Sequence, residues 1–457
     1  MAEQSSDPVG PEARDARGPQ AAGSKAAGSK AAGSGVAGTR AIVAASFGNL
    51  LEWYDFAVYA QFALYIGANF FPNGSRGADV VKAFLVFGLG FVIRPLGAVL
   101  IGIYGDRAGR KAALTATILM MAGGTLVIAV APSYAAIGLG APLILLTGRL
   151  LQGFSAGGEI GSAAAFLVEH APSERRALYA AWLQASMGMS NILGASVAFT
   201  VTALLSRAEI IRWGWRLPFF LGLVIVPVGF YLRRTLEETP VFRVEIAGDH
   251  EARGPLVRVF REHPRELAAG LGVSILWAAV VYVLLIFMPI YLQRTLGFTE
   301  AQAYGGSLLE NVLFVGGCFF FGALADRIGA RKVQMGGALA LLGAVLPLLW
   351  WLERTRSAGV LFPVLAAFGL LAASYTGVAP TTLSAMFPAR VRVTGVSLAY
   401  NVAFTVFGGF APAILAATAA GSVLAPAWYV TLAAVPALLA VRAGRAQSNS
   451  LEPIRNS

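Results

Sequence analysis

The stretch that decides the fold places two carboxylates inside a long apolar run, and it reads Gly48-Asn49-Leu50-Leu51-Glu52-Trp53-Tyr54-Asp55-Phe56-Ala57-Val58-Tyr59. The run extends from Ala41 to about Gly67, long enough to cross a bilayer as a helix of about 20 residues. Glu52, Asp55 and Tyr59 share one helical face because they are spaced i, i+3 and i+7. A charged side chain at mid-bilayer costs roughly 2.5–3.5 kcal/mol on insertion scales. Two interpretations of the acids stay open: structural ion pairs, or a proton or substrate site that lines a polar cavity.

The composition of the whole chain agrees with a membrane location. The 457 residues are 57% hydrophobic and only 13% charged, whereas a soluble domain carries about 25% charged residues. The formal net charge is +11. In a membrane protein, Lys and Arg are in excess in the cytoplasmic loops and set the orientation of the chain. The positive net charge therefore does not indicate a nucleic-acid partner, and none is expected.

Motifs for enzymatic chemistry are absent from the sequence. The single cysteine, Cys318, lies in an apolar run, which excludes a disulfide framework and a thiol metal site. The three histidines lack metal-ligand spacing, and the chain has no phosphate-binding glycine loop, HExxH motif or nucleophile elbow. We therefore expect no enzyme, no catalytic residue, no metal and no cofactor, with a proton gradient as the energy source.

Twelve apolar segments predict an all-α membrane protein with two six-helix bundles. The predicted spans are 41–67, 80–103, 112–131, 141–168, 177–204, 215–232, 267–292, 303–325, 333–352, 359–386, 393–418 and 423–441. The predicted domains are a disordered tail (1–40), an N-terminal bundle (41–233), a central loop (234–266), a C-terminal bundle (267–441) and a second tail (442–457). Continuous rather than alternating apolar runs exclude a closed barrel.

The distribution of positive charge predicts the orientation. With the N-terminus inside, the inner segments hold 25 of the 35 Lys and Arg residues, as the positive-inside rule requires. We therefore expect a multi-pass protein of the bacterial cytoplasmic membrane with both termini and the central loop in the cytoplasm. It is expected to act as a monomer.

A charged loop occurs twice, six helices apart, as Gly105-Asp106-Arg107-Ala108-Gly109-Arg110-Lys111 and Ala325-Asp326-Arg327-Ile328-Gly329-Ala330-Arg331-Lys332. Two copies of a six-helix half are typical of a transporter built from parallel repeats. The predicted gating residues are Asp106, Arg107, Arg110, Asp326 and Arg327. The alternative is a pair of solvated basic loops that obey the orientation rule. The second copy shifts its basic pair by one residue, so the two loops are not expected to act equally.

Arg94 is predicted to lie in the middle of the second span, directly before Pro95. A guanidinium stays protonated in proteins and matches a carboxylate with two hydrogen bonds, which makes Arg94 a candidate receptor for an anionic substrate. The alternative is an internal ion pair with Glu52, Asp55 or Glu159. Both hold if an acid neutralises Arg94 until the substrate displaces it and the released acid takes a proton.

The remaining candidates divide into proton carriers, a gating arginine and substrate contacts. Asp55 or Glu159 is the predicted proton carrier, with Glu52 next, and Glu310 is either a second proton site or a structural partner. Arg149 is predicted to be structural or gating. The predicted substrate contacts beside Arg94 are Tyr59, Arg216, Tyr282 and Asn401. Arg216 lies at the outer mouth of the sixth span in Trp213-Gly214-Trp215-Arg216. This segment either anchors the helix at the membrane interface, which tryptophan favours, or lets Arg216 attract anions.

Several motifs together resemble the metabolite:proton symporter branch of the major facilitator superfamily. They are the two charged loops, the opening stretch, Arg94-Pro95-Leu96-Gly97, Gly148–Glu159, Trp213–Phe219, Leu236–Pro240 and Thr394–Asn401. The segment Pro132–Pro142, with the helix after it, looks most like the citrate and tricarballylate group. The resemblance covers residues 41–441 and implies a twelve-helix fold, alternating access and uptake driven by protons.

Three functions follow from these observations as expectations. The first is proton symport of a small organic anion, a di- or tricarboxylate such as citrate. The second keeps the symporter but moves a zwitterion such as proline or betaine, with Arg94 on the carboxylate and an acid or aromatic face on the ammonium. The third is a membrane sensor that has lost transport.

Overall fold

The structure is a computed structural model that describes residues 46–72, 77–108, 110–157, 159–169, 171–234, 255–388, 391–418 and 421–443. The chain divides into two units, Met1–Ala41 and Ile42–Ser457, and every described residue belongs to the second. The predicted tail 1–40 lies outside the described residues, as do most of the second tail and part of the central loop. The predicted domain boundaries stay a prediction. Below, residues 46–234 are called the N-terminal half and 255–443 the C-terminal half.

All regular structure in the described residues of the N-terminal half is helical. After a first helix at 46–61 come α2 (Ala63–Phe70), α3 (Ala78–Val92), α4 (Arg94–Ala108), α5 (Arg110–Val130), α6 (Tyr134–Ile137), α7 (Gly140–Ala156), α8 (Glu159–Glu169), η1 (Ser173–Arg175), α9 (Arg176–Leu204), α10 (Arg207–Arg212), η2 (Gly214–Arg216) and α11 (Leu217–Arg234).

The described part of the C-terminal half is helical as well, which confirms the predicted class. It contains α13 (Pro255–Glu262), α14 (Pro264–Ala279), η3 (Val280–Phe287), α15 (Met288–Arg294), α16 (Glu300–Ile328), α17 (Ala330–Thr355), α18 (Ala358–Thr376), α19 (Ala379–Met386), α20 (Arg392–Ala403), η5 (Phe404–Gly409), α21 (Ala411–Thr418) and α22 (Ala425–Ala443).

The predicted spans correspond to helices of the structure. Within the described residues, eight helical stretches are long and apolar enough to cross a bilayer, and two shorter apolar helices occur at Thr115–Val130 and Gly214–Val224. The other two predicted spans, 41–67 and 141–168, are each broken once. The first breaks at Phe62 and the second after Ala156. The second break adjoins Glu159, whereas the first lies seven residues after Asp55.

Two spans of the C-terminal half contain a π-helical segment where they approach the N-terminal half. The span Pro264–Arg294 contains η3, and the span Arg392–Thr418 contains η5. A π-helix is rare and often marks a functional site, because it turns side chains away from their α-helical positions. Here η3 carries Tyr282 and η5 carries Phe404.

Glycines bring helices close together at the depth of the predicted site. A Cβ at Gly153 of α7 would overlap the carbonyl oxygen of Gly90, and one at Gly157 would overlap that of Arg94. A Cβ at Gly161 of α8 would overlap the Ser397 hydroxyl of the C-terminal half. Small residues allow such approaches between membrane helices. Each of these three glycines therefore permits a close contact that a larger residue would prevent.

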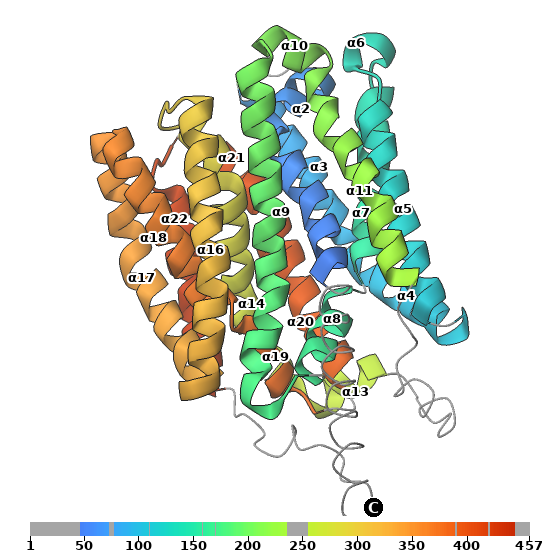
Figure 1. Cartoon of the computed structure of the whole chain (residues 1–457), viewed down its shortest axis with the longest axis vertical. Coiled ribbons are helices and arrows are strands. Elements are labelled where there is room, and N and C mark those ends of the chain that lie inside the picture. The colour runs from blue at the N-terminus through green and yellow to red at the C-terminus, as the bar shows by residue number, and fades with distance from the viewer. Residues whose placement is uncertain are drawn as a thin grey trace, which may run out of the picture. The chain divides into compact units, whose positions relative to one another are not determined.

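The two halves meet along α9 and α16, which run side by side in Figure 1. Both helices have 29 residues. In the figure, α4, α5, α7 and α11 lie on one side of this pair, and α17, α18 and α22 lie on the other. A functional site shared by the halves is therefore bordered by α9 and α16.

Contacts between the halves at the predicted outer end close the molecule there. The Tyr65 hydroxyl donates to Glu300 Oε1 at 2.8 Å, and the Tyr304 hydroxyl donates to the Gln61 carbonyl at 2.9 Å. Each bond joins the first transmembrane segment to α16.

A second set of contacts closes the predicted cytoplasmic end. Both carboxylate oxygens of Asp326 accept backbone hydrogen bonds at the start of α9, from Ala177 at 2.7 Å and Leu178 at 3.0 Å. Asn401 Nδ2 donates to the Gly157 carbonyl at 3.0 Å. With contacts at both ends, the residues between the halves are covered from either side.

Candidate functional site

A buried ion pair joins the first helix to α4. Arg94 Nη2 lies 2.8 Å from Glu52 Oε1, and the two side chains are 1% and 10% exposed. The guanidinium also stacks on aromatic rings, at 4.3 Å from the Phe91 centroid and 4.8 Å from the Phe56 centroid. Arg94 Nε makes no hydrogen bond. Arg94 therefore pairs with the acid Glu52 and has an Nε–H donor that no described residue accepts.

Asp55 is held by neutral donors and not by a direct arginine bond. Thr125 of α5 donates its hydroxyl to Asp55 Oδ2, and Gln152 Nε2 of α7 donates to the same oxygen at 3.1 Å. Gln152 Oε1 accepts from Arg149 Nη1 at 2.7 Å. Gln152 thus links the Asp55 carboxylate to the Arg149 guanidinium through one side chain.

Arg149 is enclosed by aromatic rings. Its Cζ lies 4.5 Å from the Tyr59 centroid and 4.7 Å from the centroids of Phe56 and Phe87. The side chain is fully buried, and its Nε and Nη2 make no hydrogen bond to the part of the chain that the structure describes. Because cation–π contacts stabilise a buried guanidinium without using its N–H groups, Arg149 keeps donors for an anion.

Aromatic residues of both halves meet at the same place. The Tyr282 ring centroid lies 6.0 Å from that of Trp53, 5.4 Å from that of Phe91 and 5.8 Å from that of Phe404. Tyr282 is fully buried, and its hydroxyl makes no hydrogen bond. Trp277 of α14 extends this set and donates its indole N–H to Gln184 of α9 at 3.1 Å. The arginines of the N-terminal half therefore border a surface to which the C-terminal half contributes.

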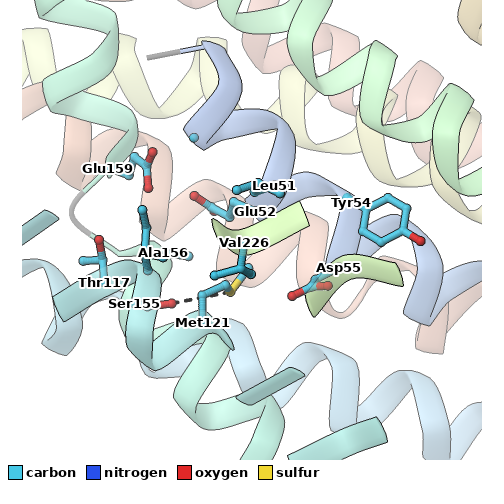
Figure 2. A pocket seen from close by; sticks show the side chains of 13 residues that line it. Leu51, Glu52, Tyr54, Asp55, Thr117, Met121, Ser155, Ala156, Glu159 and Val226 are labelled. Carbon is cyan, nitrogen blue, oxygen red and sulfur yellow. Dashed lines mark hydrogen bonds between the residues drawn. The ribbon is translucent and has the colours of Figure 1, made fainter. Parts of the chain in front are cut away.

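A pocket lies inside the N-terminal half, between the first helix, α5, α7, α8 and α11. It is lined by Gly48, Leu51, Glu52, Tyr54, Asp55, Thr117, Ile118, Met121, Ser155, Ala156, Glu159, Gly222 and Val226. In Figure 2, Glu159 lies at one end, Asp55 lies at the other, and Glu52 lies between them. Three carboxylates that were predicted to carry protons thus line one pocket.

Comparison with known proteins identifies the family. Residues 45–412 match the Major Facilitator Superfamily. The chain belongs to this superfamily. A twelve-helix major facilitator fold and a transport function, as opposed to an enzymatic one, follow for a chain matched over most of its length.

Relatives and solved structures agree with this assignment. The chain is 37% identical over 406 residues to the citrate-proton symporter of Klebsiella pneumoniae, with 88% of this chain and 90% of that one covered. It is 34% identical over 414 residues to the proline/betaine transporter of Salmonella typhimurium, with 88% and 82% covered. The partially occluded, inward-open structure of the xylose transporter XylE from E. coli has a TM-score of 0.69 at 18% identity, with 89% and 96% covered.

These matches confirm the resemblance to the metabolite:proton symporters and make the chain a proton-coupled membrane transporter of the superfamily. The likeness to XylE concerns the fold alone. Relatives named for citrate and for proline or betaine match at similar identity, so identity does not separate these substrate classes.

The other predicted substrate contacts lie at different places in this transporter. Tyr59 packs against Arg149, but its hydroxyl donates to the Ala83 carbonyl at 2.9 Å. Asn401 connects the halves through the hydrogen bond of its Nδ2 to the Gly157 carbonyl. Arg216 lies apart from them and donates to the Ala131 and Arg212 carbonyls at 2.9 and 3.1 Å. The predicted contacts at Arg94 and Tyr282 come together in the site, whereas Arg216 does not join them.

Glu310 lies on α16 in the C-terminal half. It is fully buried, and neither carboxylate oxygen makes a hydrogen bond. Of the two alternatives left open for it, the structural partner is not observed among the described residues.

The predicted gating residues are only partly described. The side chains of Asp106, Arg107 and Arg110 lie outside the described residues. Asp326 makes the contact with α9 given above, and Arg327 is exposed. In the second copy of the charged loop, Arg331 Nε donates to the Val441 carbonyl at 2.7 Å, within the C-terminal half. Arg331, one of the two shifted basic residues of this copy, therefore stabilises the C-terminal half.

Sequence reasoning missed the groups that connect the charged residues. Gln152 is three residues after Arg149, a spacing that places both on one helical face, so this signal was present. Thr125 had no such signal, because only the packing of α5 against the first helix brings its hydroxyl to Asp55.

Proposed function

We propose that the protein is a monomeric proton symporter that imports a small organic anion, a di- or tricarboxylate such as citrate, by alternating access. It acts in the bacterial cytoplasmic membrane with both termini in the cytoplasm. One observation carries this proposal: two buried guanidinium groups, Arg94 and Arg149, lie within 5 Å of the Phe56 ring and retain unbonded N–H groups between the halves. Two adjacent cations suit a substrate with more than one carboxylate.

Coupling begins at the Glu52–Arg94 pair. An incoming carboxylate replaces Glu52 on Arg94, because a fork of N–H donors binds a carboxylate in two bonds. Glu52 then loses its cation in a buried site, which favours its protonated form. Each substrate anion is thereby accompanied by a proton. Glu52, ranked behind Asp55 and Glu159 from the sequence, is the carrier for this step because it is the acid paired with Arg94.

Asp55 and Glu159 supply a proton route inside the N-terminal half. Both line the pocket of Figure 2 together with Glu52. Thr117 and Ser155 add hydroxyl groups to its wall. Protons that leave Glu52 or Asp55 pass through this pocket to Glu159 and then to the cytoplasm. The route is separate from the surface between the halves through which substrate moves.

Asp326 serves as the cytoplasmic gate. Its carboxylate binds the first backbone N–H groups of α9, where the helix dipole favours negative charge. This contact joins the two halves, so it must break when the transporter opens inward. The first charged loop, with Asp106, Arg107 and Arg110, is proposed to take part in gating as well, but not equally, because its basic pair stands one residue earlier than that of the second copy.

A zwitterion such as proline or betaine is the second candidate substrate. The observation that favours it is the set of rings around Tyr282, because aromatic faces attract an ammonium group. In that case Arg94 binds the carboxylate and the rings contact the cationic end.

Uptake into proteoliposomes tests the proposal. Labelled citrate and labelled betaine are offered with and without an inward proton gradient. Citrate accumulation that requires the gradient supports the first candidate, and betaine accumulation without citrate uptake supports the second. Absence of uptake of both solutes and of proline contradicts symport and favours the sensor.

A further inference from the structure

Four buried polar side chains on the first helix, α9 and α16 have hydrogen-bonding atoms without partners in the described chain. They are Gln61, Asn191, Glu310 and Asn311, each at most 3% exposed. The unbonded atoms are Gln61 Oε1, Asn191 Oδ1 and Nδ2, Asn311 Oδ1 and both Glu310 oxygens. Five of these atoms are acceptor oxygens and one is a donor. Buried polar atoms normally have partners, so an acceptor-rich group of this size requires an explanation.

The packing of α9 against α16 brings Asn191 and Asn311 to the same depth. A Cβ at Gly188 of α9 would contact the side chains of Phe314 and Val315, and one at Gly322 would contact Leu178. The two helices therefore run antiparallel. Three residues beyond Gly188, Asn191 lies level with Asn311.

The same two asparagines face the first helix. A Cβ at Gly194 would lie 3.3 Å from Gln61 Nε2. Gly188 of α9 therefore faces α16, and Gly194 faces the first helix. Asn191 is midway between these two glycines in the sequence. Asn311 is seven residues after Tyr304, which donates to the Gln61 carbonyl. Residues seven apart share a helical face. Asn191, Asn311 and Gln61 thus converge from both halves.

Glu310 adds the largest acceptor to this group. It is adjacent to Asn311 and four residues before Phe314, which contacts α9. On its other side, a Cβ at Gly369 of α18 would overlap the Glu310 backbone. The acceptor group, defined as Gln61, Asn191, Glu310 and Asn311, therefore extends from the first helix to the α16–α18 contact.

The acceptor group and the arginine site lie at similar depth on different faces of the first helix. Arg149 stacks on Tyr59 at 4.5 Å, and Tyr59 is two residues before Gln61, which places the two residues about 3 Å apart along the helix axis and on opposite sides of it. The N-terminal half thus offers unbonded donors on Arg94 and Arg149, and the acceptor group offers unbonded oxygens at a similar depth on another face of the first helix.

We propose that the acceptor group is a substrate subsite that receives hydrogen bonds from a donor on the solute, either a hydroxyl or an N–H group. The inference rests on the proposed function and narrows it: the transported solute carries a hydrogen-bond donor that it presents to these oxygens. A solute without a donor leaves buried oxygens unpaired, and sites of this kind reject such analogues strongly.

Two matched pairs of solutes test the subsite in proteoliposomes that contain the full-length protein. Citrate is compared with tricarballylate, which lacks only the hydroxyl, and proline with its N,N-dimethyl derivative, which lacks the N–H. We expect a KM at least about tenfold lower for the donor-bearing member of the transported pair. The pair that shows the difference distinguishes a hydroxyl from an N–H donor. Equal KM values within the transported pair overturn the subsite, even where variants fold poorly.

Variants locate the effect. Asn191→Leu and Asn311→Leu should each raise the KM of the donor-bearing solute about tenfold and leave its analogue nearly unchanged. Val312→Leu, at a side chain 49% exposed on the same helix, is the control and should keep wild-type discrimination. Unchanged discrimination in both asparagine variants overturns the proposal while transport itself persists. Failure of the wild-type protein to carry any of the four solutes or betaine contradicts the proposed function, which is a different outcome.

Discussion

The two halves of the transporter treat charge in opposite ways. In the N-terminal half, Glu52 is paired with Arg94, and Asp55 is joined to Arg149 through Gln152. In the C-terminal half, the buried acid Glu310 has no hydrogen-bond partner among the described residues, and the other contributions are rings and amides. In the proposed mechanism, this difference assigns the exchangeable ions to the N-terminal half and the orientation of the solute to the C-terminal half.

Removing Arg94 should have the greatest consequence. Arg94→Ala should lower transport at least about 100-fold, because the substrate loses its receptor and the buried Glu52 loses the guanidinium with which it pairs. The double variant Glu52→Gln/Arg94→Ala should recover thermal stability in detergent but no transport. Uptake assays and unfolding curves measure the two effects. Near-normal uptake by Arg94→Ala would show that the ions of this half do not bind substrate.

Neutralising the acids of the pocket should separate exchange from accumulation. Asp55→Asn and Glu159→Gln should each abolish uptake against a gradient while retaining counterflow, because counterflow requires no net proton movement. Asn69→Ala is the polar control, because the Asn69 amide bonds to two carbonyls near the predicted outer end. This variant should change neither the uptake against a gradient nor the counterflow by more than about twofold. If both acid variants still concentrate solute, the proton route is elsewhere.

Weakening the Asp326 gate should shift the conformational equilibrium several-fold. Loss of a helix cap costs about 1 kcal/mol, so Asp326→Ala should increase inward opening about fivefold. A cysteine introduced at Ser397, beside Gly161, reports this opening through its labelling rate, since the native Cys318 is buried. A labelling rate equal to that of the parent would remove Asp326 from the gate.

Arg216 should matter least, which contrasts it with Arg94. Its guanidinium already donates to two backbone carbonyls at the outer end, so Arg216→Ala should change KM by no more than about threefold. Kinetics of uptake at low and high salt measure the change. A tenfold or greater rise in KM would show that Arg216 contributes to substrate binding.

The sequence carried the helical class and the position of the spans because apolar length alone specifies them. It also placed Glu52 and Asp55 on one face, and both line the same pocket. The pairing of acids with arginines was beyond the sequence, because helix rotation depends on packing. Arg94 had three possible acidic partners, and the structure shows its ion pair with Glu52.

The acceptor group was harder still to predict. Asn191 and Asn311 are separated by 120 positions in the chain, and each alone resembles an ordinary polar residue on a membrane helix. Only the antiparallel packing of α9 and α16 places these two asparagines at the same level of the helix pair. Similarly, the break between the first helix and α2 has no glycine or proline to mark it.

Exchange of Glu52 for a substrate carboxylate on Arg94 is measured most directly by proton uptake upon substrate binding. Purified protein in weakly buffered detergent solution is mixed with the solute that it transports, and the change in pH is recorded. About one proton should enter the protein for each solute bound at neutral pH, and Glu52→Gln should abolish that uptake while it still binds solute. Proton uptake that is unchanged in Glu52→Gln would contradict the exchange.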